Sequence, residues 1–178
     1  MYAHGILFSK FNFGIQCYAG SDATYLERAR ICYDKCVRAT FGPNPEKVST
    51  EQMRKKLRIL SFDSLIKMSD LAMLKKVIET GAPGNINHFF KFSNRARANG
   101  ELQVILIPKT EKFRRTFLFR ASRTWNWLPN EFKNLPFHQF QPQVKRFLLG
   151  DFNGPGGEPM SFLAFPNLLP NHSPPEAQ

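Results

Sequence analysis

The sequence predicts a mainly α-helical fold: a small helical domain with at most a minor β-strand pair and a disordered C-terminal tail. Two observations carry this prediction. Apolar residues recur at intervals of three and four in several segments, and capping residues precede those segments. Clusters of glycine and proline separate the segments, and beyond residue 150 these residues abound while lysine and arginine are absent. We therefore expect a helical basic domain over residues 1–150 and a flexible segment over residues 151–178.

Composition limits the chain to one domain and shows where the charge lies. The 178 residues are 42% hydrophobic and 22% charged, values that are typical of a globular protein. The net charge is +11, with +12 in residues 51–150 and −3 in residues 151–178. This basic region would suit a polyanionic partner, although a solvated basic surface explains the same charge equally well.

The first long helix is predicted after Ser21 or Asp22 and runs to about Thr40, where Gly42 and Pro43 end it. Apolar residues do not recur at a regular interval in residues 2–18, so no helix or strand is predicted there. The predicted helix has one apolar face, formed by Tyr25, Leu26, Ala29, Cys32, Tyr33, Cys36 and Val37.

Two further helices are marked by their capping residues. Ser49 and Gln52 form a capping box that opens a short basic helix through Leu57. Ser61 caps a longer helix that stops at residues 81–84. Its predicted buried side consists of Leu65, Met68, Leu71, Ala72, Leu74, Val77 and Ile78.

The second half of the domain contains a strand candidate and a final helix. The β-type run Val104–Ile107, ended by Pro108, is the best strand candidate. Pro142 is placed in the first turn of a last helix that ends at Gly150. We expect this helix to bury Val144, Phe147 and Leu148.

Residues 117–127 favour a helix, and a strand over residues 113–119 is the alternative because apolar residues also alternate there. On the helix, the core face would hold Phe117, Leu118, Ala121, Trp125 and Leu128. The opposite face would hold Arg120, Arg123 and Trp127. Trp125 is therefore predicted to lie in the core, and Trp127 to be available for stacking on a base.

Residues 114–129 hold four arginines, two phenylalanines and two tryptophans, a combination typical of surfaces that bind nucleic acid. Four cations also crowd the short helix near residue 55, where they repel one another unless something neutralises them. We expect RNA or DNA to be bound through its phosphates. The candidate binding residues are Arg54, Lys55, Lys56, Arg58, Arg95, Arg97, Arg114, Arg115, Arg120, Arg123 and Trp127.

The block Trp125-Asn126-Trp127-Leu128-Pro129, together with residues 9–15 and the closing run Val144–Leu149, resembles a known family. The resemblance is to the region downstream of the polymerase in LINE-type (non-LTR) retrotransposon reverse transcriptases, and it covers about residues 1–150. It implies a fragment that holds template for a polymerase domain, which would be a natural partner. The chain would be a truncated copy or a host gene derived from one.

Catalysis is not expected. The family's polymerase needs paired aspartates to hold two metal ions, and no two aspartates are adjacent here. They are Asp22, Asp34, Asp63, Asp70 and Asp151. Two alternatives to nucleic-acid binding remain: a protein-interaction module that uses Phe89, Phe90 and Phe92, and an open reading frame without selected activity.

Cysteines and histidines predict neither a metal site nor a cofactor. Cys32 and Cys36 lie one helical turn apart, but no histidine pair has a matching spacing, so we expect buried apolar cysteines. Three cysteines favour a reducing compartment. No transmembrane segment or signal peptide is evident. We therefore expect a protein of the nucleus or cytoplasm that does not bind a membrane.

Overall fold

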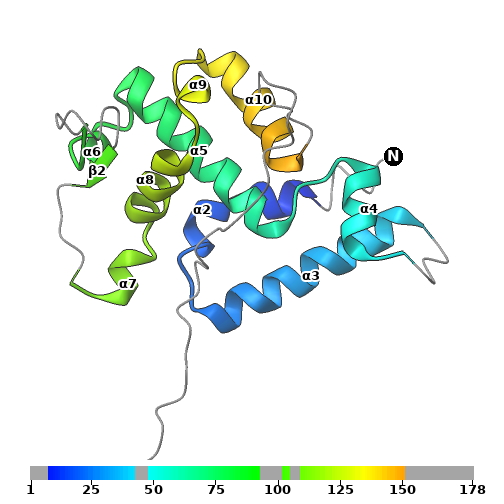
Figure 1. The fold of residues 1–178 in the computed structure, drawn as a ribbon. Helices are drawn as coiled ribbons and strands as arrows, with labels where there is room; N and C mark the ends of the chain where they lie inside the picture. Colours follow the sequence, from blue (N-terminus) through cyan, green and yellow to red (C-terminus); the bar gives the residue numbers. More distant parts are fainter. Residues whose placement is uncertain (1–7, 43–47, 93–101, 105–108, 151–178) are drawn as a thin grey trace, which may run out of the picture.

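The computed structural model describes residues 8–42, 48–92, 102–104 and 109–150. Within these ranges the chain is mainly helical and has one antiparallel strand pair, so the predicted fold class is confirmed (Figure 1). The predicted flexible segment at residues 151–178 lies outside the described residues. After a helical turn at residues 8–12, the elements are α2 (Ile15–Tyr18), α3 (Ala23–Phe41), α4 (Thr50–Leu57), α5 (Phe62–Thr80), α6 (Gly84–Asn87), β1 (Phe90–Phe92), β2 (Leu102–Val104), α7 (Glu111–Arg114), α8 (Phe117–Trp127), α9 (Asn130–Lys133) and α10 (Phe137–Leu149).

Helix α5 is the central element, because α2, α3, α6, α8 and α10 all contact it. It begins as predicted at Ser61, whose hydroxyl accepts a hydrogen bond from the N–H of Ser64 at 3.1 Å. It ends at Gly81, which has a φ of 66° and so adopts the left-handed conformation that glycine tolerates best. In Figure 1, α9 and α10 lie above α5 and α8 lies below it, while α3 and α4 lie at the lower right.

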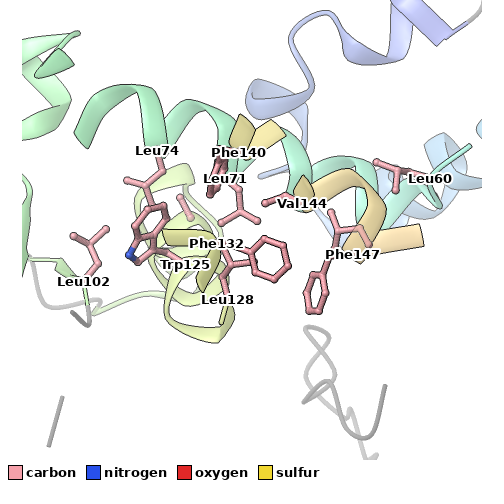
Figure 2. Close-up of a cluster of buried hydrophobic side chains, with 12 residues drawn as sticks. Leu60, Leu71, Leu74, Leu102, Trp125, Leu128, Phe132, Phe140, Val144 and Phe147 are labelled. Atoms are coloured by element: carbon pink, nitrogen blue, oxygen red, sulfur yellow. The ribbon is translucent and has the colours of Figure 1, made fainter. Parts of the chain in front are cut away.

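One hydrophobic cluster lies between α5 and the helices α8 to α10, and we call it the α8–α10 cluster. Figure 2 shows Trp125 beside Leu74, and Phe132 between Trp125 and Phe147. Four of the cluster's twelve buried members are aromatic. Its buried members are Leu60, Leu71, Leu74, Leu102, Ala121, Trp125, Leu128, Phe132, Phe140, Val144, Phe147 and Leu148.

A second cluster, the Tyr33 cluster, joins α3 and α4 to the start of α5. The rings of Phe8 and Phe11 meet Tyr33 edge-on, each with centroids 5.2 Å apart. The buried Tyr33 hydroxyl donates a hydrogen bond to the Leu60 carbonyl at 2.8 Å, and burial raises the pKa of that hydroxyl. The buried members are Phe8, Tyr33, Val37, Met53, Ile59 and Phe62.

Helices α3 and α4 confirm two predicted starts. Asp22 is the N-cap residue of α3, which ends at Phe41, one residue beyond the predicted Thr40. At α4 both bonds of the capping box are present: the Ser49 hydroxyl accepts from the Gln52 N–H, and the Gln52 side chain accepts from the Ser49 N–H, each at 3.2 Å. Capping residues are therefore reliable signals in this chain.

Helix α8 has the predicted bounds, and the alternative strand over residues 113–119 is wrong because those residues belong to α7, a short turn and α8. The hydroxyl of Thr110 starts α7 by accepting the N–H of Phe113. Ala121 and Trp125 are buried against the core, so tertiary packing favours the helical period over the alternating one.

Of the predicted strand Val104–Ile107, the described residues include Val104, which lies in β2. The observed strand β2 begins at Leu102 and pairs with β1, with Phe92 opposite Leu102; residues 105–107 of the predicted run lie outside the described residues. The side chain of Asn126 holds β2 against α8. Its Oδ1 accepts the Leu102 N–H at 2.8 Å, and its Nδ2 donates to the Leu102 carbonyl at 3.0 Å.

Pro142 lies in the interior of α10, so its predicted place in the first turn is wrong. The helix begins five residues earlier, at Phe137, because Phe140 is fully buried and extends the apolar face toward the N-terminus. Proline has no N–H, so the carbonyl of His138 receives no helical hydrogen bond from position 142. The predicted inward residues Val144, Phe147 and Leu148 are buried, and Gly150 ends the helix as expected.

Candidate nucleic-acid interface

Each of the four aspartates within the described ranges forms an ion pair with a different arginine. Asp22 pairs with Arg115 at 2.8 Å, Asp34 with Arg54 at 2.7 Å, Asp63 with Arg30 at 2.8 Å and Asp70 with Arg120 at 3.0 Å. Three of these arginines, at positions 54, 115 and 120, were candidates for binding phosphate. The structure shows that they connect parts of the same chain.

Arg120 was expected opposite the core face, and this placement is wrong. Only 12% of its side chain is exposed, and both of its bonds to Asp70 are formed: Nε to Oδ2 at 3.0 Å and Nη2 to Oδ1 at 3.1 Å. The guanidinium also donates to the carbonyls of Arg115 and Gln16. Arg120 therefore links α5 and α8 to α2 and the end of α7.

Asp70 is the buried partner of Arg120, with only 2% of its side chain exposed. Burial raises the pKa of Asp70, and the hydrogen bonds and positive charge of Arg120 act in the opposite direction. The pair is enclosed by protein, so it is not placed to meet a phosphate from outside.

The crowded cations of α4 are partly neutralised within the chain. Arg54 pairs with Asp34 of α3, and Lys55 pairs with Glu51 at 3.1 Å. The Lys56 ammonium lies 5.8 Å from the centre of the Phe41 ring. Arg58 is exposed at the C-cap of α4, where its φ of 53° turns the chain toward α5.

Two exposed cations on α3 were not predicted as site residues. Lys35 follows Asp34, and Arg38 donates from Nε and Nη2 to the Thr50 hydroxyl of α4 at 3.1 and 3.0 Å. Together with the exposed cations of α4 they form a set on one helix pair. We call it the α3–α4 basic surface, and its members are Lys35, Arg38, Lys55, Lys56 and Arg58.

Two of the remaining arginine candidates, Arg114 and Arg115, lie next to each other at Glu111. Arg115 is bound to Asp22 and Glu111, and Arg114 lies 3.9 Å from Glu111. Arg123 is exposed on α8. The candidates Arg95 and Arg97 lie outside the described residues.

The tryptophan block has mainly structural contacts. Trp125 is 3% exposed and Leu128 1% exposed, so the prediction that Trp125 lies in the core is confirmed. Asn126 holds β2, as described above, and Pro129 is the N-cap residue of α9. The residues that carry the family resemblance therefore organise the fold around α8.

Trp127, at 36% exposure, is the accessible ring of the block. Its centroid lies 5.3 Å from that of Phe147, and the Lys67 ammonium lies 5.8 Å from the ring centre. Burial lowers the pKa of Lys67, and the charge of Asp63 partly offsets this effect. A stacking role for Trp127 stays a prediction.

The alternative protein-interaction surface, formed by Phe89, Phe90 and Phe92, is exposed only in part. Phe90 is half-buried and packs against the α8–α10 cluster, and the ring of Phe89 lies against His88. Phe92 is 44% exposed.

The prediction that Cys32 and Cys36 are buried is wrong for Cys32, which is exposed, while Cys36 is half-buried. Helix α3 buries Tyr33 and Val37 instead, so the helix face that carries Cys32 and Cys36 is turned away from the core. Burial raises the pKa of the Cys36 thiol, and the neighbouring Cys32 adds to the effect. Within the described ranges, no three His, Cys, Asp or Glu side chains are grouped so that they could hold a metal ion.

Comparison of the chain with models of known protein families, with curated proteins and with solved structures gave no match. In the part of the chain that the structure describes, no helix has both the length and the apolar character needed to span a bilayer.

Proposed function

We propose that the chain is a non-catalytic nucleic-acid-binding module that contacts phosphates of RNA or DNA through the α3–α4 basic surface. The observation that carries this proposal is that nearly all carboxylates of the described residues are already ion-paired within the chain. Eight of the nine Asp and Glu side chains in the described ranges are already ion-paired with cations of the same chain. The same ranges hold 22 Lys and Arg, so a large positive excess is left for an external polyanion.

The α3–α4 basic surface suits this role because its helices are held together. Arg54 bridges to Asp34, and Arg38 bridges to Thr50, so the exposed cations stand on a fixed frame. Three of its five cations are lysines, whose ammonium groups act as point charges on phosphates, and the sequence has no base-reading motif. We therefore expect binding with little preference for sequence.

The resemblance to the region downstream of a LINE-type polymerase supports the same proposal, since such a region would hold template close to a polymerase. A reverse transcriptase polymerase domain is the protein partner that this origin implies. An origin as a truncated copy and an origin as a host gene derived from one both agree with the proposal.

Replacing Lys55, Lys56 and Arg58 together by Gln should weaken nucleic-acid binding at low salt and flatten its salt dependence. Each lost phosphate contact removes about one unit from the slope of log K against log[salt], so the slope should fall in magnitude by about two to three units. The measurement is fluorescence anisotropy with labelled RNA and DNA of equal length. Arg54 is kept, because its loss would leave Asp34 without its partner.

The matched control replaces three exposed cations of α5 and α10, Lys76, Lys145 and Arg146, by Gln. It makes the same change in net charge on α5 and α10 and leaves α3 and α4 unchanged. Equal loss of affinity and slope in the two variants would contradict the assignment to the α3–α4 basic surface. It would instead indicate a response to total charge alone.

A further inference from the structure

Helix α3 presents a second apolar stripe that the core covers only in part, leaving Tyr25 and Cys32 exposed. This stripe and the segments before it form an open, mostly apolar groove of about 470 Å³. Tyr25 in the groove is 63% exposed, and Cys32 is exposed. The principal lining residues are Phe11, Tyr18, Tyr25, Leu26, Cys32 and Cys36.

We propose that this groove is a docking site for residues 160–169 of the same chain. That segment reads Met-Ser-Phe-Leu-Ala-Phe-Pro-Asn-Leu-Leu and holds the longest concentration of apolar side chains after Gly150. Phe162 and Phe165 are large rings that match a groove lined by Phe11, Tyr18 and Tyr25. Docking would remove apolar surface of both partners from water.

Charge complementarity favours this acidic segment as the occupant of the groove over a partner with a basic surface. Residues 151–178 contain three acidic residues and no Lys or Arg, and Glu158 lies two residues before the apolar run. Lys10 lines the groove, and Arg28 and Lys35 are exposed on the same helix α3. An acidic apolar segment therefore complements a groove that has Lys10 in its lining and these cations on the same helix.

The chain is long enough for this contact. Gly150 follows Phe147 and Leu148, which belong to the same buried cluster as Leu60. The Leu60 carbonyl accepts the hydroxyl of Tyr33, so α3 lies close behind that cluster. The ten residues 151–160 span up to about 35 Å when extended. This exceeds the length of a 19-residue helix such as α3, which is about 28 Å. Tethering raises the local concentration of the segment to about the millimolar range, so weak docking suffices.

The cysteines of the full-length chain test this proposal without further labels. Cys32 lines the groove, whereas Cys17 is exposed on α2 and does not line it. Maleimide labelling under reducing conditions, followed by peptide mapping, measures both rates in one sample. Cys36 is left out of the comparison because burial raises its pKa. The variant is Phe162→Ser with Phe165→Ser, and the control is Phe152→Ser.

If the segment is docked for about 90% of the time, the double variant should label Cys32 about tenfold faster than the unchanged chain. The Cys17 rate should stay the same in all samples, and Phe152→Ser should change neither rate. Equal Cys32 rates in the unchanged chain and the double variant would overturn the proposal. Protection that rises with protein concentration would indicate a second copy as the occupant, and protection lost on deleting residues 1–7 alone would indicate that segment; either result also overturns it.

Discussion

Replacing Arg120 by Met should lower the free energy of unfolding by about 3–5 kcal/mol, because it leaves a buried carboxylate without its partner. Asp70 is 2% exposed and receives two hydrogen bonds from Arg120. The substitution also removes the bonds to the carbonyls of Arg115 and Gln16. Urea unfolding followed by far-UV circular dichroism measures the effect.

The control is Arg123→Met, which removes an exposed arginine from the same helix and should change stability by no more than about 0.5 kcal/mol. The double variant Asp70→Leu with Arg120→Met should recover much of the loss, because neither charge then remains buried. If Arg120→Met unfolds at the same urea concentration as Arg123→Met, the buried ion pair does not stabilise the fold.

Trp125→Ala should destabilise the protein by about 3–5 kcal/mol, the usual range for emptying a large aromatic site in a core. The ring is 3% exposed and lies 6.1 Å from Phe140, centre to centre. Such a loss is a large part of the total stability of a small domain, which is typically about 5–15 kcal/mol. The measurement is again urea unfolding.

Two matched variants separate volume from hydrogen bonding. Among the described residues the indole N–H of Trp125 has no hydrogen-bond partner, so Trp125→Phe should cost clearly less than Trp125→Ala. Trp127→Ala, which removes the more exposed ring of the same helix, should also cost less. A Trp125→Ala variant with unchanged stability would contradict the core position of this side chain.

The sequence was sufficient to predict α3, α4 and α5 because their local signals agree with one another, whereas the short helices α2, α6, α7 and α9 were not predicted. Ser49, Ser61 and Asp22 precede apolar repeats, and each of them is the N-cap residue of a helix in the structure. The apolar period then predicted much of the buried side of α5, including Leu71, Leu74 and Val77. Capping and periodicity are short-range properties, which is why one sequence reveals them.

The ion pairs were not predictable in the same way. Asp70 and Arg120 are 50 residues apart, and periodicity assigns any arginine to the solvent side. A possible signal was the position of Asp70 inside an apolar run, next to Leu71. It became interpretable only once α5 and α8 were seen in contact.

Cys32 and Pro142 illustrate a related limit. Helix α3 has more apolar residues than one core can cover, and periodicity does not show that Tyr33 is buried while Tyr25 stays exposed. At Pro142 the preference of proline for a first turn was outweighed by the burial of Phe140 two residues earlier.

For the candidate site, counting charges in the sequence predicts the net charge but not the partner of each cation. The sequence gives the sum of charges over residues 51–150, but not which cations are used internally. Arg54 and Arg120 are used in this way. Lys35 and Arg38 are added to the site because the structure brings α3 against α4.

The central claim is that the chain binds nucleic acid by neutralising phosphates, and a salt titration of the full-length protein tests it most directly. Labelled RNA and DNA of equal length and several sequences are titrated at a series of salt concentrations. If four to eight phosphates are contacted, log K should fall against log[salt] with a slope of roughly −3 to −7, with little difference between sequences. Well-folded protein that fails to bind either nucleic acid at low salt would contradict the claim.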